Sequence, residues 1–302
     1  MKVPLLILPI IAVVFISGCT TNGDPMTFGD GVVIQAWESD FPRLYSGESI
    51  QFRLKVQNQG GTFAEDVETS IIDIDPREWN LKNSKDSINQ LIAPDSDTDT
   101  PGQTWTTIWT GEAPDFDKGS VVPRDVTVRV SYDYMQTATK SITLVDETEL
   151  RRIIQQGGSI PISSDTSTSG PLSISVTTAP FARTAKTTDP IPINIKITNK
   201  LYGNSGLPTV IPRTSSPRSP TGMQEPVYLE IEVPNGIRVK DCSTRDWYWM
   251  FEGKEADVTC RLEITDMPSS GERVNKIMRF HASYRYKLDA TTTVTVVGQG
   301  YR

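Results

Sequence analysis

Apolar and polar residues alternate along many short segments of the chain. In residues 52–57 every second side chain is apolar, beginning at Phe52, and residues 193–198 repeat the pattern from Ile193. A period of two with aromatic and β-branched residues on one face predicts a half-buried β-strand. Further segments of this kind are residues 32–37, 67–74, 104–109, 126–134, 139–145, 172–177, 227–233, 257–264, 277–286 and 291–297. We therefore expect an all-β chain whose strands form sandwiches.

An internal repeat divides the chain. Residues 128–145 (VRVSYDYMQTATKSITLV) and 280–297 (FHASYRYKLDATTTVTVV) align without a gap, and 7 of the 18 positions are identical. The aligned positions include Tyr132 with Tyr284 and Tyr134 with Tyr286.

A second pair of matching segments lies upstream of the first pair, in the same order along the chain. Residues 52–58 match residues 193–199, with Asn58 and Asn199 in register. The offset is 141 for this pair (193 − 52) and 152 for the downstream pair (280 − 128), so the second copy carries a net insertion of 11 residues. The repeat predicts two tandem β-sandwich domains, residues 31–146 and 171–298.

Residues 147–170 are predicted to join the two domains. Asp146 can cap a helix with Glu149 three residues later, and an apolar stripe that includes Leu150 ends before Gly157. We expect this helix to brace the first domain, although a partner-binding helix is the alternative. The Ser/Thr-rich residues 158–170 that follow are expected to be a flexible linker and the preferred site of proteolysis.

The segment from Tyr45 to Gly61 (YSGESIQFRLKVQNQGG), followed by Ala64 and Val67, resembles the CARDB-type domain and related archaeal surface-layer-associated domains. That resemblance implies an immunoglobulin-like sandwich on a prokaryotic cell surface, in a class often linked to adhesion or surface assembly. It covers the first half of the first domain well and the matching part of the second more weakly. The resemblance points to a fold rather than to a particular partner.

The N-terminus is expected to direct export. Lys2 is followed by an apolar run over residues 3–16, which is shorter than the roughly 20 residues that a membrane-spanning helix needs. The run ends in Ile-Ser-Gly-Cys19, which resembles the lipobox of prokaryotic lipoproteins. We expect residues 1–18 to be a signal peptide, Cys19 to carry lipid, and residues 19–30 to be a flexible tether. An ordinary signal peptide or an uncleaved anchor is the alternative.

Cys242 and Cys260 remain as an even pair in a chain expected to be exported, so they are predicted to form a disulfide. Two free buried thiols are the alternative. Closing a loop of roughly 19 residues would contribute about 3 kcal/mol. The turn signal at residues 252–254 predicts a hairpin that brings the two cysteines together.

The net charge and the residue types present argue against nucleic-acid binding and against catalysis. The net charge is −7 and the isoelectric point is near 5.0, which argues against a nucleic-acid partner. The chain has one histidine, His281, on a predicted strand. Neither a catalytic triad, a histidine metal site nor a phosphate-binding glycine loop is apparent, so we expect no enzyme activity and no cofactor.

The nearest pattern to a metal site is Asp95, Asp97 and Asp99, spaced like the start of an EF-hand loop. The sixth position is Thr100 instead of Gly, and the twelfth is Thr106 instead of Glu. A solvated acidic loop is therefore the expectation, with a weak calcium site as the alternative.

Two segments are candidate binding surfaces. The first holds Trp247, Tyr248, Trp249 and Phe251. In a strand, Trp247, Trp249 and Phe251 would share one face, either packed on the core or exposed as an aromatic platform for a glycan or protein. The second is the proline-rich stretch 207–226, expected to be a long exposed loop rather than a central strand.

Taken together, these features predict a non-catalytic, lipid-anchored protein of the cell surface. Its partners are expected to be the membrane, through the lipid on Cys19, and a protein involved in adhesion or envelope assembly. The alternative is a carbohydrate-binding module that uses the Trp247 segment.

Overall fold

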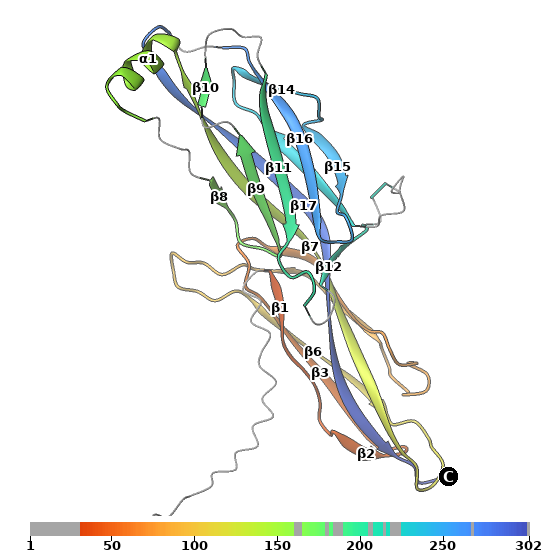
Figure 1. Cartoon of the computed structure of the whole chain (residues 1–302). Helices are drawn as coiled ribbons and strands as arrows, with labels where there is room; N and C mark the ends of the chain where they lie inside the picture. The colour runs from red at the N-terminus through yellow and green to blue at the C-terminus, as the bar shows by residue number, and fades with distance from the viewer. Residues whose placement is uncertain are drawn as a thin grey trace, which may run out of the picture.

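The computed structural model describes residues 31–159, 165–178, 181–183, 190–204, 208–213, 216–217, 225–266 and 269–300. Those residues form an elongated molecule of two β-sandwiches stacked end to end, with one short helix (Figure 1). The predicted all-β class is confirmed. The predicted signal peptide, the tether and Cys19 lie outside the described residues.

Each sandwich has its own outer sheet. A three-stranded sheet covers the first sandwich, in the order β1 (Val32–Ser39), β3 (Ser49–Asn58), β6 (Thr104–Glu112). A four-stranded sheet covers the second, in the order β14 (Ile237–Lys240), β16 (Glu255–Ile264), β11 (Ile191–Asn199), β9 (Leu172–Thr178).

A single ten-stranded sheet forms the other layer of both sandwiches. Its main path runs in the order β15 (Arg245–Trp249), β13 (Pro226–Glu232), β17 (Arg273–Val297), β7 (Val121–Val145), β4 (Ala64–Ile71), β5 (Lys85–Leu91). Four short strands pair with the two long ones: β2 (Arg43–Tyr45) and β12 (Thr209–Ile211) with β17, and β8 (Asp165–Ser167) and β10 (Phe181–Arg183) with β7.

The two long strands, β7 and β17, hold the molecule together. Each has 25 residues, and they pair antiparallel over their whole length, from Arg273 opposite Val145 to Val297 opposite Val121. At about 3.4 Å per residue, such a strand is roughly 80 Å long. Both strands therefore run through both sandwiches (Figure 1). The separate strands predicted at 126–134 and 139–145 are one strand, and so are those at 277–286 and 291–297.

The domain boundaries drawn from the repeat, 31–146 and 171–298, treat each repeat as a separate unit. The strand pairing differs from that picture. Each sandwich contains half of β7 from the first repeat and half of β17 from the second. The pairings of the other strands match between the repeats, because β3 lies between β1 and β6 just as β11 lies between β9 and β16.

The middle of the long strands, which we call the waist, is where the two sandwiches meet. On the inner face of the ten-stranded sheet, Tyr132 pairs with Tyr286 and Tyr134 pairs with Tyr284. All four side chains are buried, and neighbouring rings lie 5.9 to 6.2 Å apart between centroids. Burial raises the pKa of the Tyr132, Tyr284 and Tyr286 hydroxyls above its usual range.

The two asparagines aligned in the repeat, Asn58 and Asn199, both lie buried at the waist, at the ends of β3 and β11. The Asn199 Nδ2 donates to the carbonyl oxygens of Pro208 and Gly253, at 3.0 Å each. Its Oδ1 accepts from the Tyr286 hydroxyl at 2.8 Å. The Asn58 Nδ2 likewise donates to the carbonyl oxygens of Thr62 and Leu91. These amides satisfy backbone groups where the strands end, which explains why the repeat retains them.

The alternation seen in the sequence matches the burial. Phe52, Leu54 and Val56 are fully buried and so are Ile195 and Ile197, whereas the residues between them face outward. One continuous apolar core fills both sandwiches.

The predicted helix forms as α1 (Glu147–Gln155), and the Asp146 carboxylate accepts from the Thr148 N–H at 2.9 Å. Leu150 and Ile153 are buried, whereas Ile154 is 62% exposed. The helix lies at the far end of the second sandwich, away from β2 (Figure 1). The prediction that it braces the first domain is wrong, because β7 carries the chain through the second sandwich before the helix begins.

Parts of two predicted loops pair with the long strands. In the predicted linker, Asp165–Ser167 is β8, which pairs with residues 138–140 of β7. In the proline-rich stretch, Thr209–Ile211 is β12, which pairs with residues 285–287 of β17. No helix among the described residues is both long and apolar enough to cross a membrane.

Candidate functional site

The predicted disulfide between Cys242 and Cys260 is present, with Cα atoms 5.3 Å apart. That separation is within the range a disulfide requires. The predicted turn also exists, since Phe251 and Glu255 form a bridge around residues 252–254. The strands on either side of this turn belong to different sheets, however, so it is not the predicted hairpin. Cys242 follows β14, and it is the pairing of β14 with β16 that brings it next to Cys260.

The aromatic segment has one core face and one outer face. Met250 is fully buried, and Tyr248 packs against the core. Trp247 and Trp249 are partly buried on the opposite face of β15. The Trp247 ring contacts that of Tyr228 on the neighbouring strand, with centroids 5.3 Å apart and ring planes tilted by 59°.

Phe251 follows β15 and is 55% exposed. Because β15 is an edge strand of the ten-stranded sheet, Trp247 and Phe251 border solvent at the side of the second sandwich. The segment therefore supplies both a part of the core and a small aromatic surface.

The three aspartates at 95, 97 and 99 form a tight turn rather than a ligand set. Asp95 pairs with Thr100 across the turn, and its carboxylate accepts from the Asp97 N–H and the Thr98 hydroxyl, both at 2.9 Å. The Thr98 hydroxyl lowers the pKa of Asp95 below its usual value. Among the described residues, no group of three or more His, Cys, Asp or Glu side chains could hold a metal ion. The geometry does not support the alternative of a weak calcium site at this turn.

His281 lies on the outer face of β17, where its Nδ1 is 2.9 Å from the Thr137 hydroxyl. Its Nε2 lies 3.3 Å from a carboxylate oxygen of Glu232. No serine or cysteine is hydrogen-bonded to this ring among the contacts of the described residues. The ring joins strands β7, β13 and β17 through side chains, as a structural residue does.

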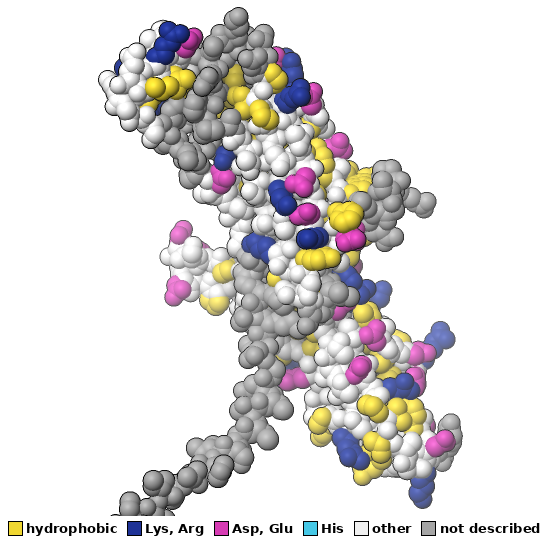
Figure 2. All heavy atoms as spheres, viewed as in Figure 1, with side chains coloured by type: hydrophobic (Ala, Val, Ile, Leu, Met, Phe, Trp, Pro, Cys, Tyr) yellow, Lys and Arg dark blue, Asp and Glu magenta, His cyan; other side chains and the backbone are white. Residues whose placement is uncertain are grey.

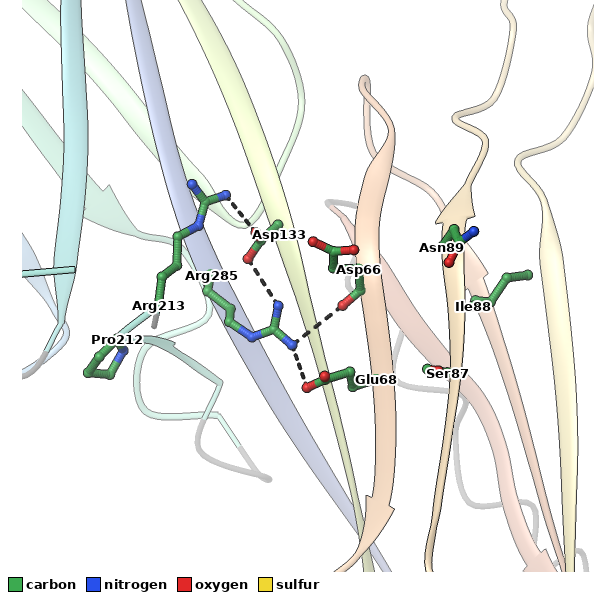
Figure 3. A pocket seen from close by; sticks show the side chains of 9 residues that line it. All are labelled: Asp66, Glu68, Ser87, Ile88, Asn89, Asp133, Pro212, Arg213 and Arg285. Carbon is green, nitrogen blue, oxygen red and sulfur yellow. Dashed lines mark hydrogen bonds and ion pairs between the residues drawn. The ribbon is translucent and has the colours of Figure 1, made fainter. Parts of the chain in front are cut away.

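A polar pocket lies on the outer face of the sheet at the waist, and sequence reasoning missed it. Its volume is about 460 Å³. Figure 3 shows side chains from β4, β5, β7 and β17, and from the chain after β12, around it. The lining residues are Asp66, Glu68, Ser87, Ile88, Asn89, Asp133, Pro212, Arg213 and Arg285.

Arg285 is the centre of this pocket. Its guanidinium donates to Asp133 at 3.1 Å and to Glu68 at 2.7 Å. It also contacts the backbone oxygen of Asp66 at 3.4 Å and the Ser131 hydroxyl at 3.3 Å. The side chains of Arg285 and Asp133 are only 14% and 18% exposed, so water competes little with their bond, whereas Glu68 is 66% exposed.

Asp133 forms an ion pair with a second arginine, Arg213. The Arg213 guanidinium lies 3.0 Å from its other carboxylate oxygen and 3.5 Å from the Tyr284 carbonyl oxygen. The charged groups thus form a chain from Glu68 through Arg285 and Asp133 to Arg213 (Figure 3). Because these groups neutralise one another, we interpret the pocket mainly as a structural connection between strands and less as a ligand-binding site.

One signal in the sequence could have located this joint. Within the repeated Ser-Tyr-x-Tyr motif, the variable position is Asp133 in the first copy and Arg285 in the second. An opposite charge at matched positions of a repeat indicates that the two positions face each other, but only if the repeated strands pair.

The visible face of the molecule has no single-sign patch. Figure 2 shows acidic and basic side chains interspersed over both sandwiches, with small apolar areas between them. Such a face lacks the clustered positive charge with which proteins bind nucleic acid.

Comparisons with known proteins give little beyond this geometry. The family described as "Domain of unknown function (DUF8453)" matches residues 42–151, which is 110 of the 302 residues. No curated protein matches the chain. The crystal structure of collagen adhesin (CNA) from S. aureus is aligned over 89% of this chain and 94% of that one, with 8% identity and a TM-score of 0.13. A similarity this low supports no inference on function. The DUF8453 match runs from just before β2 to the middle of α1, so it leaves out β1 and ends near the end of the first repeat.

Proposed function

We propose that this chain is a non-catalytic, lipid-anchored cell-surface protein that acts in adhesion or in the assembly of envelope proteins. The observation that carries the proposal is the pair of 25-residue strands that run through both sandwiches. A linker between two separate domains would allow them to bend, whereas paired strands shared by both sandwiches resist bending. A stiff double sandwich suits a protein that holds a partner at a fixed geometry.

The sequence and the disulfide support the part of the proposal that concerns export and anchoring. The Cys242–Cys260 bond is of a kind that persists in oxidising compartments outside the cytoplasm. The run that ends at Cys19 supplies the lipid attachment point. A single acyl chain binds membranes only marginally, so stable anchoring requires the multiple acylation typical of bacterial-type lipoproteins or a second contact.

The absence of catalysis is part of the proposal. Both arginines of the waist pocket are bound to its carboxylates Glu68 and Asp133, and His281 is held between strands. Neither arrangement leaves a nucleophile beside a base, which hydrolytic chemistry needs.

The test of location uses the full chain in its native cells. Wild-type protein should partition into the detergent phase and be accessible to protease on intact cells. The Cys19→Ala variant should partition into the aqueous phase or stay unprocessed, whereas the nearby Thr21→Ala, which leaves every cysteine in place, should partition as the wild type does. Mass spectrometry showing an unmodified Cys19 in the mature protein would contradict the lipid anchor.

The test of partner class uses the same cells. A photo-crosslinking residue in place of Phe251, which is exposed beside Trp247, should capture an envelope protein, whereas one in place of the buried Met250 should capture none. Equal capture at both positions, or capture at neither, would contradict a protein contact at this surface.

A carbohydrate-binding role is the second candidate, and the pair of aromatic rings that Trp247 and Tyr228 form at the sheet edge favours it. Aromatic faces that border solvent are a common platform for sugar rings. On a glycan array, the wild-type protein would bind and Trp247→Ala would lose the signal, while Trp79→Phe, a change in the core of the first sandwich, would keep it. An array with no signal for the wild type would remove this candidate.

A further inference from the structure

The two repeats are related by an approximate twofold axis. We call residues 31–157 repeat one and residues 158–300 repeat two. The short strand β2 of repeat one pairs in parallel with residues 295–297 of β17. The matching strand β10 of repeat two pairs in parallel with residues 143–145 of β7. These target segments differ by 152 positions (295 − 143), which is the offset of the repeat itself.

This relationship means that the repeats exchange strands. Strand β2 of repeat one finds its partner in the far half of β17, which belongs to repeat two, and β10 finds its partner in β7. The far half of each long strand completes the sandwich of the other repeat. Neither repeat therefore contains all the strands of a sandwich, and the same topology would arise from two separate chains joined as a strand-exchanged dimer.

The axis passes between Asp133 and Arg285. These two residues are register partners in the β7–β17 pair, and they are also 152 positions apart. A residue on the axis would face its own copy if two identical repeats paired. Two copies of repeat one would place Asp133 against Asp133, and two copies of repeat two would place Arg285 against Arg285.

Like charges directly opposite each other destabilise an antiparallel pair, whereas opposite charges stabilise it. The inner face of the sheet does not favour a mixed pair over a pair of identical repeats, because the four positions nearest the axis, two in each repeat, are all tyrosine. The outer face thus carries the charges that distinguish one pairing from another.

The other charged residues of the waist pocket are also divided between the two repeats by the sign of their charge. Its three acidic residues, Asp66, Glu68 and Asp133, all come from repeat one. Its two arginines, Arg213 and Arg285, both come from repeat two. Every ion pair across the waist pocket therefore joins an acid of one repeat to a base of the other (Figure 3).

We propose that the β7–β17 seam is an interaction surface selective for the opposite repeat, and that the acidic set of repeat one and the two arginines of repeat two determine this selectivity. The partner that each repeat fits is the complementary repeat, and the covalent connection between them is not needed to keep the pair together. In this proposal, the waist pocket is the place where the acidic residues of repeat one pair with the arginines of repeat two.

The experiment uses the full chain with a specific protease site inserted between Gly157 and Gly158, in the exposed turn after α1. After cleavage, the two halves should elute together at the size of the uncut chain and separate only in denaturant. When denaturant is removed, native mass spectrometry should show one half of each kind in nearly every pair. Halves that elute separately without denaturant would overturn the proposal.

The selectivity test adds the isosteric change Asp133→Asn to the cleavable chain. Removing the like-charge contact should lower the ratio of mixed pairs to pairs of repeat one by about fivefold after refolding. Arg285→Gln should do the same for pairs of repeat two, which provides a second reading if one variant folds poorly.

The matched control is Asp289→Asn. Asp289 pairs with Arg129 on the same strands, with bonds of 2.9 and 2.8 Å, but this pair lies off the axis. In a pair of identical repeats, position 129 would face Thr137 and position 289 would face His281, so no like charges would meet. Pairs of repeat one do not contain Asp289, so Asp289→Asn should lower the ratio of mixed pairs to pairs of repeat one only through the lost bond to Arg129, and by less than Asp133→Asn, which also relieves a like-charge contact. An equal change of ratio in the two variants would overturn the assigned role of the axis charges.

Discussion

Removing the disulfide should destabilise both sandwiches together, although the bond lies in only one of them. Cys242 and Cys260 join the end of β14 to β16 in the outer sheet of the second sandwich. The perturbation is the double variant Cys242→Ala and Cys260→Ala, which leaves no buried polar atom at the nearly inaccessible Cys260 position.

The size of the effect follows from the closed loop. The two cysteines are 18 positions apart, and releasing a loop of that length increases the entropy of the unfolded chain by an amount worth about 3 kcal/mol. When the second sandwich opens, residues 273–284 of β17 lose their place in the sheet, and the pairing with β7 that continues into the first sandwich loses its support. The loss of about 3 kcal/mol should therefore be shared by the whole chain.

The assay is hydrogen exchange followed by mass spectrometry at increasing urea concentrations. For a slope near 3 kcal/mol per M, the midpoint of the variant should fall by roughly 1 M. Peptides from β3 in the first sandwich and from β11 in the second should lose protection at the same lowered midpoint. If β3 kept the wild-type midpoint while β11 alone shifted, the coupling through the shared strands would be refuted.

Three further outcomes are expected. Asn199→Ala should cost about 2–3 kcal/mol in urea unfolding, because two backbone carbonyls and a tyrosine hydroxyl lose their partner, whereas the exposed Asn194→Ala should be nearly neutral. Raising the pH above about 10 should lower stability, by up to about 1.4 kcal/mol per pH unit for each tyrosine, because the raised pKa values of Tyr132 and Tyr284 keep them protonated in the folded chain while the unfolded chain releases those protons. A flat profile between pH 9 and 11 would contradict their burial. Asp146→Ala should speed amide exchange at the start of α1, and this difference should vanish at acidic pH, where protonation of a carboxyl of lowered pKa removes the cap in the wild type.

The sequence predicted the strands well but not their continuity. Gln136 lies between the two strands expected at residues 126–134 and 139–145. In the structure Gln136 is fully buried on the inner face, with its amide bonded to the carbonyl oxygens of Thr168 and Leu172. A polar residue whose hydrogen bonds are satisfied inside a core has the same sequence signature as a turn, and its partners are more than 30 positions away.

The candidate site was predicted only in part. Spacing and expected compartment were sufficient for the Cys242–Cys260 bond, because a disulfide depends on two residues. The waist pocket depends on which strands pair: Glu68 and Arg285 are 217 positions apart. No local pattern links them, and the charge reversal between Asp133 and Arg285 becomes informative only once the two long strands are known to be neighbours.

The place where β1 begins also decides how a tethered molecule would carry load. The Val32 N–H donates to the Tyr132 hydroxyl at 3.2 Å, so the chain enters the fold at the waist and not at either end. A lipid on Cys19 would be linked to this point by residues 20–30, a segment that reaches at most about 40 Å when extended. Tension from the membrane would then act at the midpoint of the molecule, as on a beam held at its centre. The end with β2 and the end with α1 would both remain free, so one anchored molecule would offer two tips instead of one.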